Sequence, residues 1–130
     1  MDTRLTNNFD LKEFACNDSA KTDVPAKYVC NAQKVAKNLQ VLRDYLKKPI
    51  YINSAYRTPA YNKAIGGATS SQHLTASAAD IRVQGMSSKQ VYDSILTLIS
   101  LGKMHNGGVG LYRTFVHYDV RNLPARWDLR

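Results

Sequence analysis

The sequence lacks long hydrophobic runs, and its 130 residues leave room for about one core. Its longest apolar stretches span only a few residues, so no transmembrane helix is expected. The N-terminal segment is polar and lacks the apolar stretch of a secretory signal peptide. We therefore expect a single domain over residues 1–130, monomeric, made in the cytoplasm and without a membrane span.

Cysteine and glutamate are also scarce. Cys16 and Cys30 lie too far apart for a C-x-x-C metal site and have no histidine near them. In a chain without a secretion signal, two buried thiols are favoured over a disulfide. Glu13 is the single glutamate, so acid–base or metal chemistry must draw on nine aspartates and three histidines.

Positive charge is in excess, with a formal net charge of +8. A basic surface favours polyanions such as nucleic acid, anionic lipid or an anionic cell wall. No run of five basic residues occurs, and no RNA- or DNA-binding motif is recognisable. The charge alone names no partner, and we expect no nucleic acid.

Apolar spacing predicts helices mixed with short strands. Residues 25–47 are expected to form a long helix, because Pro25 suits a first turn, apolar residues recur at intervals of three and four, and Pro49 ends the pattern. A capping box at Ser87 and Gln90 begins another helix. The remaining expected elements are strands at 50–53, 79–83, 108–112 and 114–120, a short helix at 60–65 and a loop at 66–77.

The order of these elements favours one fold class. Strict alternation of strand and helix is missing, so the pattern favours an α+β fold over a doubly wound α/β fold. We expect a small, mainly antiparallel sheet packed against the long helix.

Two clusters carry the side chains for chemistry. His73 and Asp80 are separated by small residues that let the backbone bend around an ion. On a strand at 114–120, His117 and Asp119 share one face, while Val116 and Tyr118 face a core.

Each of these residues also has an ordinary structural interpretation, as a hydrogen-bonded histidine or a turn-capping aspartate. Together, His73, Asp80 and His117 supply three donors that suit Zn²⁺ and leave a fourth position for water. That is the layout of a catalytic zinc site.

Three segments, in this order along the chain, resemble the motifs of one enzyme family. Residues 54–62 are similar to the S-G-Y-R-T/S-P-x-Y-N motif of zinc D-alanyl-D-alanine carboxypeptidase-like peptidases. Residues 71–80 resemble their S-x-H-x-x-G-x-A-x-D metal motif, and residues 115–121 their F-V-H-x-D motif. These enzymes are peptidoglycan peptidases, some of them phage endolysins, and they share the fold of the Hedgehog signalling domain.

The resemblance assigns roles to particular residues. It implies zinc held by His73, Asp80 and His117, with Arg57 as a substrate anchor that also stabilises the oxyanion. Ser71 is expected to bind the substrate backbone. His105, in a loop before Asn-Gly-Gly, is interpreted as not a ligand, and Tyr112 and Trp127 suit a cleft or a core equally well.

The sequence departs from the family pattern at two positions. Ala76 replaces the motif glycine, which is costly if φ there is positive. Thr114 stands where several relatives place an acidic base, three residues before the last zinc ligand. Asp119 is then the best remaining acid, with two open roles: the general base, or an acceptor that fixes the tautomer of a zinc-bound imidazole.

The most consistent interpretation is a zinc-dependent peptidoglycan peptidase, either a carboxypeptidase or an endopeptidase. Without a signal peptide, we expect it to reach the wall through phage lysis or as part of a virion. One alternative is an inactive zinc-binding module of the same fold, supported by Thr114. The other is a basic nucleic-acid-binding domain.

Overall fold

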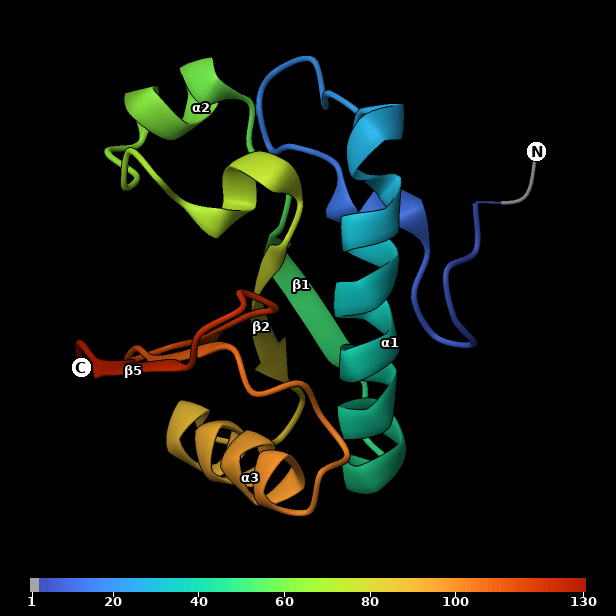
Figure 1. Cartoon of the computed structure of the whole chain (residues 1–130), viewed down its shortest axis with the longest axis vertical. Coiled ribbons are helices and arrows are strands. Elements are labelled where there is room, and N and C mark those ends of the chain that lie inside the picture. Colours follow the sequence, from blue (N-terminus) through green and yellow to red (C-terminus); the bar gives the residue numbers. More distant parts are fainter. Residues whose placement is uncertain (1–2) are drawn as a thin grey trace.

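The computed structural model describes residues 3–130 as a mixed sheet with helices packed beside it (Figure 1). The long helix α1 lies along one side of the sheet and α3 lies across one end of it. In chain order the elements are η1 (Leu11–Phe14), η2 (Ala26–Tyr28), α1 (Val29–Leu46), β1 (Ile50–Ser54), α2 (Pro59–Ala64), η3 (Gln72–Thr75), β2 (Ala78–Val83), α3 (Ser88–Ser100), β3 (Gly108–Leu111), β4 (Val116–Asp119) and β5 (Ala125–Asp128).

The strands form one sheet in the order β1-β2-β4-β3-β5. All neighbours are antiparallel except β3 and β5, which run parallel. The predicted α+β class and mainly antiparallel sheet are confirmed. Strand β5 is missing from the sequence prediction.

One apolar core joins the helices to the sheet. Helices α1 and α3 both contact β2, and Leu39, Leu42 and Ile95 are fully buried between these elements. This confirms the apolar stripe predicted for residues 25–47, although the first turn is a 3₁₀ turn, η2. Within residues 3–130, no helix has the length and apolarity needed to span a bilayer.

Strand alternation divides β4 between the core and the opposite face. Val116 and Tyr118 are fully buried in the core. His117 and Asp119 lie on the other face and contact each other, as predicted. The same alternation in β2 places Ile81 in the core and Asp80 beside His117.

Both cysteines are free thiols. Cys16 is buried as predicted, but Cys30 is exposed, so that expectation is wrong for Cys30. The reason is helical geometry. Cys30 precedes the buried Ala32 by two positions, which places it about 200° around α1, on the solvent face.

Three non-glycine residues adopt a left-handed conformation: Lys21, Lys47 and Ala76. Lys47 caps the C-terminus of α1 with φ of 56° and is exposed. Ala76 caps η3 with φ of 58° and is fully buried. This conformation costs an L-residue about 1–2 kcal/mol, so the replacement of the motif glycine by Ala76 is a strained one.

We expect Lys47→Gly to raise the free energy of unfolding by about 0.5–1 kcal/mol, because glycine relieves the strain and no packing is lost. Ala76→Gly should change it less, because the same relief is offset by about 0.8 kcal/mol of lost methyl burial. Urea unfolding of both variants measures the difference. A destabilised Lys47→Gly variant would contradict the argument from strain.

Candidate metal centre

A single row of residues crosses the sheet at the site. The β2–β4 register sets Asp80 directly opposite His117. Strand β3 places Gly110 next to His117, and β5 places Trp127 next to Gly110. Directly opposed residues share one face of a sheet, so Asp80, His117 and Trp127 all project from the face that α1 and α3 leave open.

His73 comes from outside the sheet, on the turn η3. The predicted loop at 66–77 is therefore wrong at residues 72–75, where Ser71 begins a 3₁₀ turn by accepting a hydrogen bond from the backbone N–H of His73 at 3.1 Å. The ring Nδ1 lies 2.6 Å from the carbonyl oxygen of Ala55. A carbonyl can only accept, so Nδ1 carries the proton and Nε2 is free to bind a metal.

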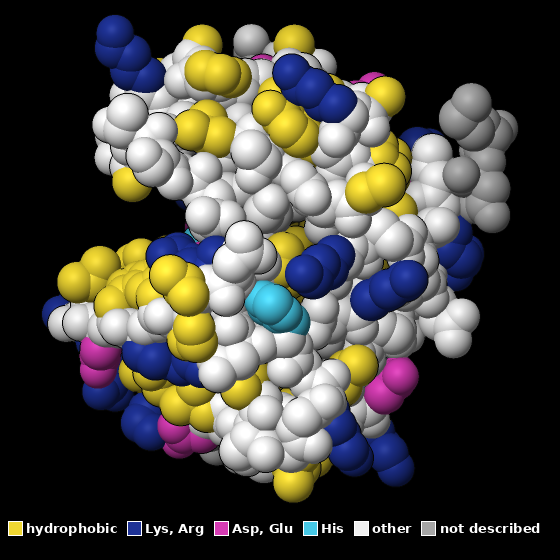
Figure 2. All heavy atoms as spheres, viewed as in Figure 1, with side chains coloured by type: hydrophobic (Ala, Val, Ile, Leu, Met, Phe, Trp, Pro, Cys, Tyr) yellow, Lys and Arg dark blue, Asp and Glu magenta, His cyan; other side chains and the backbone are white. Residues whose placement is uncertain are grey.

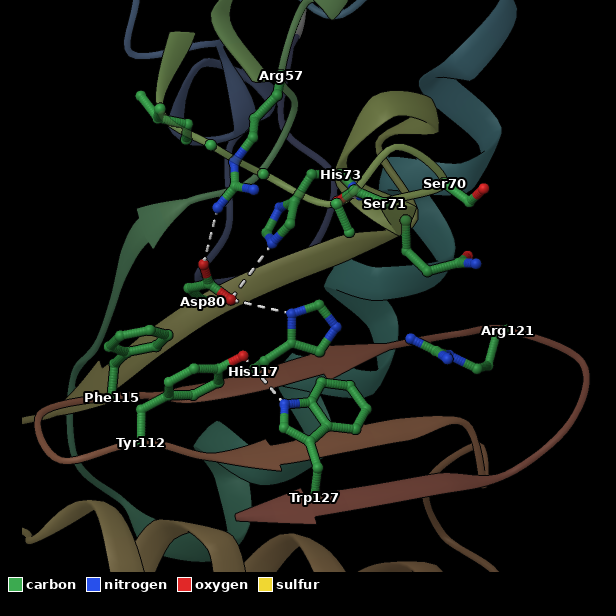
Figure 3. Close-up of a pocket in the computed structure, with 15 residues that line it drawn as sticks. Arg57, Ser70, Ser71, His73, Asp80, Tyr112, Phe115, His117, Arg121 and Trp127 are labelled. Carbon is green, nitrogen blue, oxygen red and sulfur yellow. Dashed lines mark hydrogen bonds and ion pairs between the residues drawn. The ribbon is translucent and has the colours of Figure 1, made fainter. Parts of the chain in front are cut away.

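Three donors converge where η3 meets the sheet (Figure 3). The Oδ1 atom of Asp80 lies 3.3 Å from Nε2 of His73 and 3.0 Å from Nδ1 of His117. Zinc with four ligands at about 2.0–2.1 Å holds its donors about 3.3 Å apart. The donor types and the two distances from Asp80 therefore fit Zn²⁺. The three donor atoms lie within 4.8 Å of one another, and all three residues are buried.

Asp119 lies behind His117. Its Oδ2 lies 2.7 Å from Nε2 of His117, while the other ring nitrogen faces Asp80. Asp119 is fully buried and forms a bidentate pair with Arg121. These contacts fit the positioning role, in which Asp119 fixes the tautomer of His117, and they engage both of its carboxylate oxygens.

Burial and hydrogen bonding act in opposite directions on these groups. Burial alone would raise the pKa of Asp80, but hydrogen bonds from His117 and His73 outweigh it and lower this pKa well below its usual range. Burial alone would lower the pKa of His117, yet its bonds to Asp119 and Asp80 raise it. The pKa of Asp119 is lowered, because bonds from His117 and Arg121 outweigh its burial.

The donors open into a pocket of about 490 Å³. Figure 2 shows the molecule hollowed between the part that carries α2 and the part that carries β5. Arg57 and Ser71 both line the pocket. Arg57 places Nη2 at 3.3 Å from Oδ2 of Asp80, Nη1 at 3.3 Å from Asn62 and Nε at 3.2 Å from Ser54.

Aromatic residues form the opposite wall. Tyr112 and Trp127, for which the sequence left cleft and core equally open, line the pocket together with Phe115. Arg121 also lines it and lies over the Trp127 ring at 5.3 Å. His105 lies elsewhere, with Nε2 at 2.8 Å from the carbonyl oxygen of Arg121.

A family model for Peptidase M15 matches residues 7–119. The chain belongs to the Peptidase M15 family. A search of curated proteins found no match. The predicted resemblance is thereby confirmed at the level of the family, and M15 membership supports a zinc metallopeptidase. The match spans η1 through β4, so it includes all three donors.

This M15 pocket carries few acidic groups. Asp80 is the one carboxylate among the described residues that line it. Thr114 is exposed in the turn between β3 and β4 and is not part of the lining. The position at which relatives carry an acidic base therefore offers no carboxylate to this pocket.

We expect Asp119→Asn to weaken zinc binding by about 10–100-fold, because the amide holds the His117 tautomer less firmly than a carboxylate does. Competition with a coloured chelator measures the affinity. Asp93→Asn is the control, since Asp93 pairs with Lys89 on the exposed face of α3. Normal zinc affinity in a folded Asp119→Asn protein would contradict the positioning role.

Zinc binding should also depend on pH. The raised pKa of His117 means that a proton competes with the metal for Nδ1 as the pH falls through that value. The apparent zinc affinity is therefore expected to fall toward acid by on the order of tenfold per pH unit once His117 is protonated. Chelator competition between about pH 5.5 and 8.5 tests this, and a flat profile would show that His117 is not a ligand.

Proposed function

We propose that the protein is a zinc-dependent peptidoglycan peptidase, which hydrolyses a peptide bond in the murein stem peptide or cross-bridge. The observation that carries this proposal is the convergence of His73, Asp80 and His117 at the floor of an open pocket. Membership of Peptidase M15 supports the same conclusion. The proposal extends to a phage-type lytic enzyme that acts on the cell wall after release.

The chain's own residues prepare the site for hydrolysis. His73 offers Nε2 and His117 offers Nδ1, because Ala55 and Asp119 engage the other ring nitrogens. When bound by these nitrogens and Asp80, zinc supplies an activated water and polarises the substrate carbonyl. Arg57 holds Asp80 through Oδ2, which leaves Oδ1 directed at the two imidazoles.

Two arginines make the pocket suitable for an acidic peptide. Arg57 and Arg121 both line it. Each pairs with one carboxylate, Asp80 or Asp119, and each keeps further N–H groups beyond that pair. Guanidinium groups bind carboxylates well, and stem peptides carry them. The net charge of +8 supports adsorption to an anionic wall.

One observation favours a second candidate, an inactive zinc-binding module of the same fold. Thr114 replaces the usual acid, and the described pocket lining holds no carboxylate besides Asp80. Hydrolysis by this family usually needs a group that accepts the proton of the attacking water. A protein that binds zinc and muropeptides without cleaving them would fit this alternative.

Digestion of purified peptidoglycan separates the two candidates. We expect the zinc-loaded protein to release new muropeptides, to lose this activity on chelation and to regain it with zinc. Mass spectrometry of the products identifies the bond. His73→Ala should lose both zinc and turnover, whereas Asp93→Asn should keep both. If the zinc-loaded protein leaves the muropeptides intact, the peptidase function is rejected. If it shows salt-dependent DNA binding and no cleavage, a nucleic-acid-binding protein is favoured.

A further inference from the structure

The hydroxyl of Tyr112 is a polar group of the aromatic wall, and it lies beside the three metal donors. Tyr112 follows β3, and its ring stacks on Phe115 with centroids 4.4 Å apart and planes 10° from parallel. Figure 3 shows the hydroxyl directed toward Asp80 and His117. The stack therefore fixes the ring and aims its oxygen into the pocket.

Trp127 determines how that hydroxyl can bond. Its Nε1 donates to the Tyr112 oxygen at 3.0 Å. An indole nitrogen only donates, so Tyr112 acts as the acceptor in this bond and keeps its own hydrogen. Across residues 3–130 this is the one hydrogen bond of the Tyr112 hydroxyl. The O–H is thus left to donate to a group that enters the pocket.

Gly110 makes the arrangement possible. It lies between His117 and Trp127 in the row that crosses the sheet. A Cβ atom at this position would overlap the indole nitrogen of Trp127. The missing side chain lets the indole lie across β3, within 5.1 Å of the His117 ring, and reach Tyr112.

The expected oxyanion donor is more heavily committed. All three nitrogens of the Arg57 guanidinium already bond within the chain, to Ser54, Asn62 and Asp80, which engages three of its five N–H groups. A carbonyl oxygen that gains negative charge during hydrolysis needs a donor aimed at it. The Tyr112 O–H has no acceptor of its own among the described residues, and it lies on the sheet side of the three metal-binding atoms.

We propose that Tyr112 donates a hydrogen bond to the scissile carbonyl oxygen as it becomes tetrahedral, and that Trp127 positions Tyr112 for this. The proton stays on Tyr112, so no bond to hydrogen is broken. This inference rests on the proposed peptidase function. It adds a catalytic residue, Tyr112, and a positioning residue, Trp127.

Tyr112→Phe is the direct test, because it keeps the ring stack and removes the hydroxyl. We expect kcat to fall about 100-fold with KM changed less than about threefold, as for the loss of one oxyanion donor. Zinc content should not change, and Tm should fall only slightly, because the half-buried indole of Trp127 loses its acceptor. Tyr51→Phe is the matched control, since that exposed tyrosine on β1 bonds Gln84 outside the pocket.

Ligand binding gives a second readout that needs no turnover. A phosphinate peptide copies the tetrahedral oxyanion, whereas the cleaved product peptide does not. We expect calorimetry to show that Tyr112→Phe binds the phosphinate at least about tenfold more weakly than the unaltered protein does. Its affinity for the product peptide should equal that of the unaltered protein. Equal loss for both ligands would show general binding and would overturn the proposal.

Trp127→Phe tests the positioning step. It should lower kcat by a smaller factor than Tyr112→Phe, and the double variant should be no slower than Tyr112→Phe alone. Additive losses would show that Trp127 does not act through Tyr112.

The two levels of the proposal fail in different ways. If the unaltered protein leaves every muropeptide intact, both the peptidase function and the role of Tyr112 are rejected. An active protein whose Tyr112→Phe variant keeps its kcat and phosphinate affinity overturns the role of Tyr112 alone.

Discussion

The antiparallel register between β2 and β4 sets Asp80 opposite His117, and every other feature of the pocket depends on that pairing. A shift of one residue would turn His117 toward the core and Tyr118 toward the pocket. The core prevents this, because Val116 and Tyr118 are fully buried in it on the other face of the sheet. Apolar packing on one face thus fixes the chemistry on the other.

The groups of the site form a chain of alternating charge, which runs from Arg57 through the buried Asp80, His117 and Asp119 to Arg121. Each carboxylate has a cationic or imidazole partner on both sides, and no buried side-chain polar atom in the described chain lacks a hydrogen bond. A fully satisfied network holds its members in one geometry. The donors are therefore arranged before any metal binds, although burying these charges contributes little net stability.

Local patterns in the sequence predicted those parts of the fold that local physics determines. The stripe on α1, the capping box before α3 and the alternation in β4 all follow from neighbours within a few residues. Strand β5 does not, because the apolar–polar alternation of Ala125–Asp128 covers only four residues, and the segment becomes a strand by pairing with β3. The ring partner of His73 was likewise beyond prediction, since its contact with Ala55 depends on how η3 packs. The contact of His117 with Asp119 matches one of the two roles that the sequence left open for Asp119.

The aromatic wall helps to decide whether this pocket hydrolyses a peptide or only binds zinc. A zinc-binding module needs the three donors and the groups that orient them, which are the members of the Arg57–Arg121 chain together with His73 and the carbonyl of Ala55. It has no need for a glycine in mid-strand, which weakens a sheet, or for a half-buried indole that engages a tyrosine hydroxyl. Gly110 and Trp127 together hold the Tyr112 O–H, which has no acceptor of its own in the described chain, beside the metal-binding atoms. Such an arrangement has a use where a substrate oxygen gains charge, which favours the peptidase over the inactive module.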